Sequence, residues 1–372
     1  MENTVLAFGT TNFETITFQD TNYNGGFYAL QATQAEDTQI TFVSAADVAH
    51  FAVGDYVAIY AYTDDIPNDL LPTETSQITS VNPLTGVLGL AWPLARGFST
   101  PSIANVTPLA TTNVGITNLT IQGTEPLTAT EVFGLVVQNS TIIFDTTPGP
   151  LDPAALELNT IRNFQFIGNT ITAINPGQVI LELPQRNSEN GLIQNNTISA
   201  KSVVFWEYAA RWNFNGNHFW LFPDSTTTVG YGQDVGIAIS GLDITFDGND
   251  VHGGNAHGGY ALLQDLYAVG NYADYVGNIT ITNNTLYCQE SNSWCVQLET
   301  ANPVFVNNRV YATGPAAGIY ITSPLTETAR IQGNYFSLGT GIGIALGSET
   351  TRQSVVSGNT ILSSGPTLAV LH

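Results

Sequence analysis

The chain has 372 residues, of which 30 are Asp or Glu and only 8 are Lys or Arg, so its formal net charge at pH 7 is −22. Because such a surface repels phosphate groups and anionic lipid headgroups, we expect no nucleic-acid partner and no membrane partner. Hydrophobic residues make up 43% of the sequence, which is enough for a sizeable core and excludes disorder as the main state.

Residues 1–110 lack the repeat that dominates the rest of the chain. Two segments in this region, Val53–Tyr60 and Ile78–Leu90, alternate in hydrophobicity as strands do, and the second contains the turn sequence Asn82-Pro-Leu-Thr-Gly86. We predict an N-terminal capping region over residues 1–110 with a β-hairpin module, followed by a repetitive domain over residues 111–372.

A short motif, apolar-x-(Gly or Asn)-Asn-x-apolar, recurs eight times in the repetitive domain. The third position of the motif is always Gly or Asn, and these residue types enter the left-handed backbone region at low cost. Each copy therefore predicts a tight bend between two strands. The Asn residues at the fourth position should stack in a ladder whose side chains form hydrogen bonds with backbone groups. These residues are Asn169, Asn196, Asn217, Asn249, Asn284, Asn308, Asn334 and Asn359.

Apolar and polar residues alternate on both sides of each bend, and a third apolar segment follows in each repeat. Three strands in a repeat of about 25 residues predict one coil of a single-stranded parallel β-helix. A β-sandwich or a propeller would require hairpin turns and a longer period. We therefore expect an all-β fold.

The repeat resembles that of the right-handed parallel β-helix superfamily of pectate lyases and polygalacturonases over about residues 110–372. The resemblance implies a right-handed coil and a carbohydrate-active protein. In polygalacturonase-like hydrolases an acidic strand entrance is followed one coil later by a His between glycines, which places Asp234 at the general-acid position and His257 at the His position. The second aspartate of that family is Val235 here, and Cys295–Glu299 replaces its basic strand, which argues against a polygalacturonate substrate.

Outward carboxylates are expected on the third strands of neighbouring coils, between two long loops. If Val204 and Trp206 face inward, Glu207 faces outward, and the same count places further acids on the following coils. Carboxyl groups one or two coils apart would lie roughly 5–10 Å from each other, the range used in two-carboxylate glycoside hydrolysis. The predicted catalytic residues are Asp234, Glu207, Asp265, Glu299 and His257.

A second outward face follows the Asn bends. One column of this face contains His218, Asp250, Thr285 and Arg309, and its neighbour contains four aromatic side chains. Aromatic rows with polar groups between them suit sugar rings, although stacked aromatics also stabilise sheets. The predicted substrate-binding residues are the four of this aromatic column, Trp220, His252, Tyr287 and Tyr311, together with Trp294 and Gln297 of the third strands.

Metal binding has little support in the sequence. His252 and His257 lie near Asp247 and Asp250, but no helix presents both imidazoles together, so we expect no zinc and no other cofactor. Calcium held by surface carboxylates stays open.

The two cysteines, Cys288 and Cys295, fit either a disulfide of an exported protein or a reduced cytosolic pair. We expect an extracellular protein, although Met1–Val5 does not have the pattern of a signal peptide. The apolar segment Leu368–Leu371 would leave a coil edge that a homo-oligomer could cover.

Three functional hypotheses follow. The leading one is a glycoside hydrolase or transglycosidase that acts on a neutral poly- or oligosaccharide through paired carboxylates, because the net charge disfavours polyanionic glycans. A polysaccharide lyase or epimerase acting on uronates is the second, and one Lys with seven Arg leaves few residues for its chemistry. The third is a non-catalytic glycan-binding or surface spike protein.

Overall fold

The structure is a computed structural model. It describes residues 4–7, 16–19, 27–61, 73–98, 102–107, 113–123, 126–130, 132–144, 154–155, 157–159, 161–174, 180–182, 188–205, 209–221, 235–253, 261–265, 277–288, 294–300, 302–312, 317–321, 328–347, 354–366 and 368–371.

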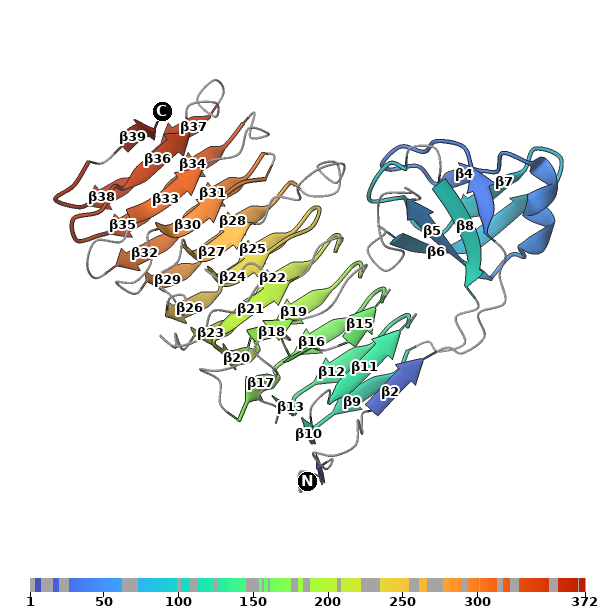
Figure 1. The fold of residues 1–372 in the computed structure, drawn as a ribbon, viewed down its shortest axis with the longest axis horizontal. Coiled ribbons are helices and arrows are strands. Elements are labelled where there is room, and N and C mark those ends of the chain that lie inside the picture. Colours follow the sequence, from blue (N-terminus) through green and yellow to red (C-terminus); the bar gives the residue numbers. More distant parts are fainter. Residues whose placement is uncertain are drawn as a thin grey trace.

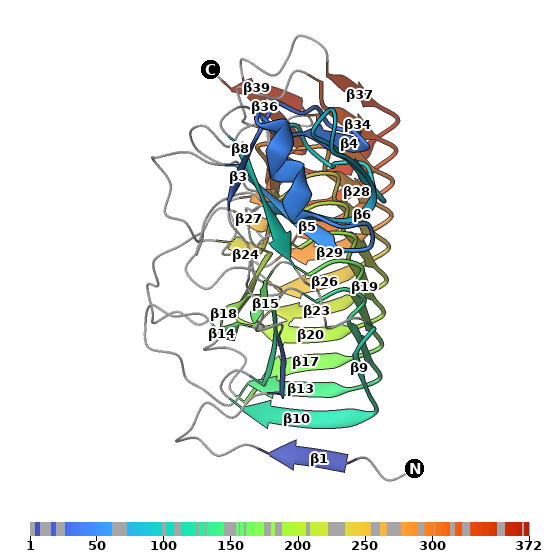
Figure 2. The same cartoon turned by 90° about the vertical axis from the view of Figure 1, so that its right-hand side faces the viewer.

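Three long parallel sheets run along the molecule and confirm the predicted parallel β-helix (Figure 1). The first sheet contains eleven strands, which Figure 2 shows in part as successive rungs. In spatial order these are β1 (Thr4–Ala7), β10 (Leu119–Gly123), β13 (Thr141–Phe144), β17 (Thr170–Ala173), β20 (Thr197–Ala200), β23 (His218–Leu221), β26 (Asp250–Gly253), β29 (Thr285–Cys288), β32 (Arg309–Ala312), β35 (Tyr335–Ser337) and β38 (Thr360–Leu362).

In each coil that has an Asn bend, a strand of the second sheet comes before the bend and a strand of the first sheet comes after it. A strand of the third sheet then follows the first-sheet strand. The second sheet consists of β9 (Gly115–Thr117), β12 (Val136–Gln138), β16 (Gln165–Ile167), β19 (Leu192–Gln194), β22 (Asn213–Asn215), β25 (Thr245–Asp247), β28 (Thr280–Thr282), β31 (Val304–Val306), β34 (Arg330–Gln332) and β37 (Val355–Ser357). The third sheet consists of β14 (Ala154–Ala155), β18 (Ile180–Glu182), β21 (Ser202–Phe205), β24 (Val235–Ile239), β27 (Ala261–Asp265), β30 (Trp294–Leu298), β33 (Ala317–Ile321), β36 (Ile344–Gly347) and β39 (Leu368–Leu371).

The predicted Asn ladder is present. Each of the eight Asn residues donates from Nδ2 to the carbonyl of a residue in the preceding coil, and the first seven donate both their backbone N–H and Nδ2 to Oδ1 of the next Asn. The amide-to-amide distances are 2.9–3.2 Å. The residue before each Asn has a positive φ of 54–67°, as the Gly and Asn pattern predicted.

Replacing Asn284 by leucine should therefore lower the free energy of unfolding by about 1–3 kcal/mol, because it removes hydrogen bonds from buried groups. Asn284 Oδ1 accepts from both the N–H and Nδ2 of Asn249, and its own Nδ2 donates to the carbonyl of Phe246. Asn213→Leu, at an exposed strand position of the second sheet, is the control and should change it by less than about 0.5 kcal/mol. Equal values for the two variants in urea unfolding would contradict the role of the ladder.

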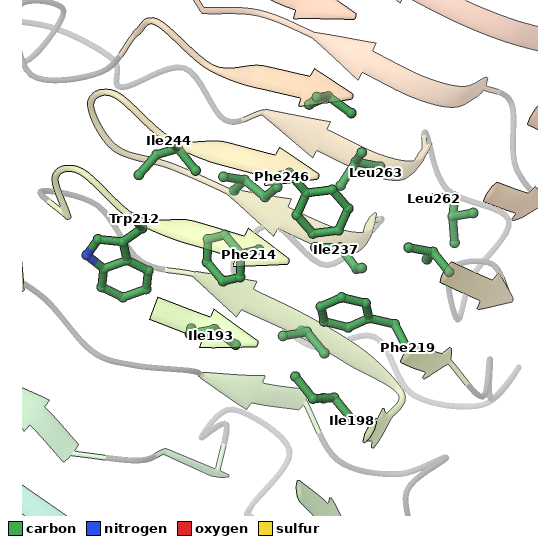
Figure 3. Close-up of a cluster of buried hydrophobic side chains, with 14 of the residues drawn as sticks. Ile193, Ile198, Trp212, Phe214, Phe219, Ile237, Ile244, Phe246, Leu262 and Leu263 are labelled. Atoms are coloured by element: carbon green, nitrogen blue, oxygen red, sulfur yellow. The ribbon is translucent and has the colours of Figure 1, made fainter. Parts of the chain in front are cut away.

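Aromatic and branched side chains fill the interior of the coils. Figure 3 shows Trp212, Phe214 and Phe246 from neighbouring coils among these buried residues. The ring centroids of Phe214 and Phe246 are 5.9 Å apart. Trp212 Nε1 donates to the carbonyl of Ser188 at 2.8 Å, so the largest core side chain is also fully satisfied.

The N-terminal region folds differently from the expected cap. β1 pairs in parallel with β10, and β2 (Ile16–Gln19) pairs in parallel with β11 (Leu127–Thr130), which also pairs with β15 (Glu157–Asn159). The parallel pairing thus includes residues before the predicted boundary at 110. These strands were missed because no Asn bend precedes them in the sequence.

A small antiparallel barrel is inserted between β2 and β9 (Figure 1). Its order is β3 (Tyr28–Leu30), β8 (Ser102–Thr107), β5 (Tyr56–Ala61), β6 (Thr73–Asn82), β7 (Val87–Leu90) and β4 (Gln39–Thr41), with a 3₁₀ helix, η1 (Ala45–His50). A bridge between Leu30 and Phe42 joins the outer strands and closes the sheet. The predicted hairpin is confirmed as β6 and β7, and Asn82 Oδ1 accepts from the N–H groups of Leu84 and Thr85 in its turn.

A buried charge cluster joins the barrel to the coils. Glu74 and Arg96 of the barrel are ion-paired at 3.1 Å, and Arg162 and Glu189 of the coils are ion-paired at 2.8 Å. Arg162 also donates to the carbonyl of Thr75 in the barrel. All four charged side chains are at most 3% exposed, so each depends on its partners instead of on water.

The carboxyl group of Glu74 titrates unusually. Burial raises the pKa of Glu74 to about 7, the charge of Glu189 contributes to the rise, and Arg96 opposes it. The N–H groups of Ala95 and Arg96 donate to the same carboxylate at 2.8 and 2.9 Å. The charge of Glu74 therefore changes near neutral pH.

Cys288 and Cys295 form a disulfide with a Cα–Cα distance of 5.7 Å. It connects β29 of the first sheet to β30 of the third sheet. The sequence left this pairing open, and the structure resolves it in favour of the bridge.

Candidate functional site

The predicted catalytic residues belong to the third sheet and its loops. Glu207, Asp234 and His257 lie outside the described residues, and for Asp265 the structure gives the backbone alone. Glu299, directly after β30, has a described side chain, which is half-buried. The convergence of these five residues on one site therefore stays a prediction.

The register of the third sheet corrects the inward and outward assignment behind part of that prediction. Val203, rather than Val204, pairs with the core residue Ile237. Asp265 pairs with Leu298, whose side chain is buried. The assignment was wrong by one residue because consecutive apolar residues in these strands are compatible with either alternation.

Three predicted residues of the third sheet lie near one another. Gln297 donates from Nε2 to Oε1 of Glu299. Trp294 stacks on Tyr320 with ring centroids 4.7 Å apart, and Tyr320 pairs in register with Gln297. Tyr320, which lies one coil after Gln297 in the same outward column, was not among the predicted site residues.

The second predicted face forms a continuous aromatic ladder on the first sheet, made of Trp220, His252, Tyr287 and Tyr311. The centroids of Trp220 and His252 are 4.3 Å apart with an interplanar angle of 15°, and those of His252 and Tyr287 are 4.3 Å apart at 16°. Tyr287 and Tyr311 follow at 5.1 Å and 14°. The strands bearing them, β23, β26, β29 and β32, are adjacent rungs (Figure 1), so the predicted column is confirmed.

The stacking decides which ring faces can meet a ligand. Inside the ladder each ring covers its neighbours, so His252 and Tyr287 present edges to solvent. Trp220 begins the ladder and is 43% exposed. The preceding residues of its column are Ser199 and Thr172, whose side chains are small and bear hydroxyl groups, so no aromatic ring of this column stacks on the indole from the preceding coil.

Asp250 lies in the adjacent column and links two imidazoles. Its Oδ2 atom is 2.9 Å from Nε2 of His252 and 3.5 Å from Nδ1 of His218. The carboxylate therefore fixes the orientation of His252 within the ladder. Within the described ranges, no three or more His, Cys, Asp or Glu side chains are grouped so that they could hold a metal ion.

At the other end of the ladder the ring order changes. Tyr335 is tilted by 54° relative to Tyr311, and their centroids are 5.9 Å apart. A shallow pocket of about 430 Å³, which we call the Arg309 pocket, opens at this position. It is lined by Asn307, Asn308, Arg309, Tyr311, Gly333 and Tyr335. Arg309 and Tyr311 lie on this face as predicted, whereas Tyr335, which pairs with Arg309 in the next coil, was not among the predicted residues.

Comparisons with known proteins agree with this architecture. Residues 202–371 match the family described as the right-handed beta helix region. The tailspike gp61 of Pseudomonas phage phi297 is similar in structure, with a TM-score of 0.58 and 13% identity, over 92% of this chain and 61% of that chain. No curated protein matches the sequence.

Two further solved structures have lower similarity. The surface adhesin PfbA of Streptococcus pneumoniae has a TM-score of 0.43 and 15% identity, over 69% of this chain and 61% of that one. The catalytic domain of a GH87 alpha-1,3-glucanase in complex with nigerose has a TM-score of 0.33 and 12% identity, over 94% and 86%.

In the part of the chain that the structure describes, no helix has the length and hydrophobicity needed to cross a membrane. This chain corresponds to 61% of the tailspike chain, so the likeness concerns a portion of that protein. The stacked parallel sheets, the likeness to the tailspike and the family match over residues 202–371 show that the chain has the right-handed parallel β-helix fold that its repeat predicted.

Proposed function

We propose that the protein is carbohydrate-active and that it binds a glycan along the aromatic ladder of the first sheet. The observation that carries this proposal is the position of Trp220 at the start of the ladder, where it is 43% exposed and is preceded in register by the small side chains of Ser199 and Thr172. A sugar ring has apolar faces and a rim of hydroxyl groups. An indole face beside hydroxyl-bearing side chains matches both parts of such a ring.

The interior of the ladder has a different role in this proposal. The faces of His252 and Tyr287 are covered by their neighbours, so these residues contribute edges, phenol groups and sheet stability. The glycan would thus stack at Trp220 and form hydrogen bonds along the ladder. Because the coils are about 4.8 Å apart, the ladder extends over about 14 Å in the direction of the coil axis.

Trp220→Ala should lower the affinity for a bound glycan at least tenfold, which corresponds to about 1.4 kcal/mol, because it removes the stacking ring at the start of the ladder. Glycan-array screening would first identify the ligand, and calorimetry would then compare the variants. Leu84→Ala, which removes a 91% exposed apolar side chain from the turn between β6 and β7 of the barrel, is the control and should retain affinity. Unchanged affinity in Trp220→Ala, or an equal loss in both variants, would reject the ladder as the binding face.

Hydrolysis of a glycan is a separate part of this proposal, and it concerns the third sheet instead of the ladder. Glu299 is half-buried and accepts a hydrogen bond from Gln297, an arrangement that holds a carboxylate in one orientation. Its predicted partners are Asp234 and His257, since the register of the third sheet removes the outward assignment on which Glu207 and Asp265 were selected. A product screen on neutral and uronate glycans would distinguish the mechanisms, since new reducing ends alone indicate hydrolysis and ultraviolet-absorbing unsaturated ends indicate a lyase. Binding without any product would indicate a non-catalytic glycan-binding protein.

A further inference from the structure

The Arg309 pocket lies at the opposite end of the aromatic ladder from Trp220. Tyr311 belongs to both the ladder and the pocket, so a ligand that follows the ladder reaches the pocket without a gap. Trp220 and Tyr311 are three coils apart in register, which corresponds to about 14 Å. The two ends differ chemically, because one is a neutral indole face and the other contains a guanidinium group.

Arg309 is the exception among the arginines that the structure describes. Its side chain is exposed and forms no hydrogen bond or ion pair with any described residue. The others have acidic or amide partners, namely Arg96 with Glu74, Arg162 with Glu189, Arg211 with Glu36 and Arg330 with Gln332. Among the described arginines, Arg309 is thus the one whose guanidinium has no side-chain partner, so its donors are available to a ligand.

The surroundings of Arg309 suit an anionic oxygen pair. Its strand neighbour in the preceding coil is Thr285 and its neighbour in the next coil is Tyr335. A guanidinium binds a carboxylate through two parallel hydrogen bonds, and phenol groups such as those of Tyr311 and Tyr335 can donate to the same oxygens. The nearest acid of this column, Asp250, is two coils away, about 10 Å in strand spacing.

We propose that the Arg309 pocket binds the carboxylate of an acidic sugar residue, so that the glycan on the ladder carries isolated carboxylates. This inference rests on the proposed glycan binding and specifies the substrate class. A net charge of −22 disfavours a polymer with a charge on every residue. One carboxylate against one arginine, with neutral sugars over the rest of the ladder, is compatible with both the local cation and the overall charge.

The test compares uronate-containing oligosaccharides with the same oligosaccharides after reduction of each carboxylate to a primary alcohol. The native protein should bind the acidic form at least tenfold more tightly. Arg309→Gln should abolish this preference while leaving the affinity for the reduced form unchanged. Arg309→Lys keeps the charge but loses the paired hydrogen bonds, so an intermediate preference is expected. Arg330→Gln, an exposed arginine of the second sheet, is the control and should retain the full preference.

The outcomes separate this inference from the proposed function. Equal binding of both forms by the native protein, or a preference that persists in Arg309→Gln, would overturn the carboxylate site and leave glycan binding on the ladder intact. Loss of the preference in Arg330→Gln as well would show a general charge effect and would also overturn it. Binding of neither form, together with a negative glycan array, would reject the proposed function itself.

Discussion

Arg162→Met should lower the free energy of unfolding by about 3–5 kcal/mol, because it leaves a buried carboxylate without its partner. Arg162 forms the 2.8 Å ion pair with Glu189 and donates to the barrel at Thr75. Its guanidinium also lies 4.7 Å from the ring centroid of Trp92 in the barrel. Without it, the charges of Glu189 and Glu74 repel each other in a buried junction.

Urea unfolding, followed by tryptophan fluorescence, would measure this loss. Arg330→Met is the control, since Arg330 is exposed and its replacement should change the unfolding free energy by less than about 0.5 kcal/mol. The double variant Arg162→Met with Glu189→Leu should recover most of the loss, because no unpaired charge then remains. A double variant as unstable as Arg162→Met would show that packing, rather than charge pairing, holds the barrel on the coils.

The second large effect concerns pH. The pKa of Glu74 is raised from 4.5 to about 7 by burial and by Glu189, so between these values the folded protein holds a proton that the unfolded chain has lost. The contribution of the Glu74 carboxyl group to the free energy of unfolding is therefore greatest below about pH 4.5, and it is lost as the pH rises through 7. The expected loss is about 3 kcal/mol at most.

Glu74→Gln isolates this contribution, because its amide does not titrate. The protein carries many other carboxylates, so the quantity to measure is the difference in unfolding free energy between the native protein and the variant at each pH. As the pH rises from about 4.5 to 7, the unfolding free energy of the native protein should fall relative to that of the variant. A difference that is constant with pH would mean that Glu74 stays ionised beside Arg96 throughout this range.

The Asn ladder could be predicted from the sequence because the tight bend restricts the residue types at two neighbouring positions. The bend needs a left-handed residue, and the buried amide must follow it directly, as at Gly168 and Asn169 or Asn283 and Asn284. The aromatic columns could be predicted for the same reason, since every residue at a fixed distance after the bend has the same register.

Other features lacked such a marker. The bend before the second sheet also has a positive φ, but its residues include Arg211 and Asp243 beside several Asn, so no motif was visible. The third strands are apolar on consecutive positions, which concealed the pairing of Val203 with Ile237. The charge cluster brings residues 74 and 189 together across an inserted barrel, and nothing local in the sequence indicates that contact.

The Asn ladder has a consequence for how the molecule can change in length. Successive Asn residues are 21 to 35 positions apart in sequence, yet every pair is joined by the same hydrogen bonds. All variation in coil length is therefore accommodated between the ladder positions. Duplication or deletion of the segment from one Asn to the next can thus add or remove a whole coil, because the new neighbours pair in the same register. Insertion or deletion of one residue within the bend would instead change the register of the strands on both sides of it, and so disturb two sheets at once.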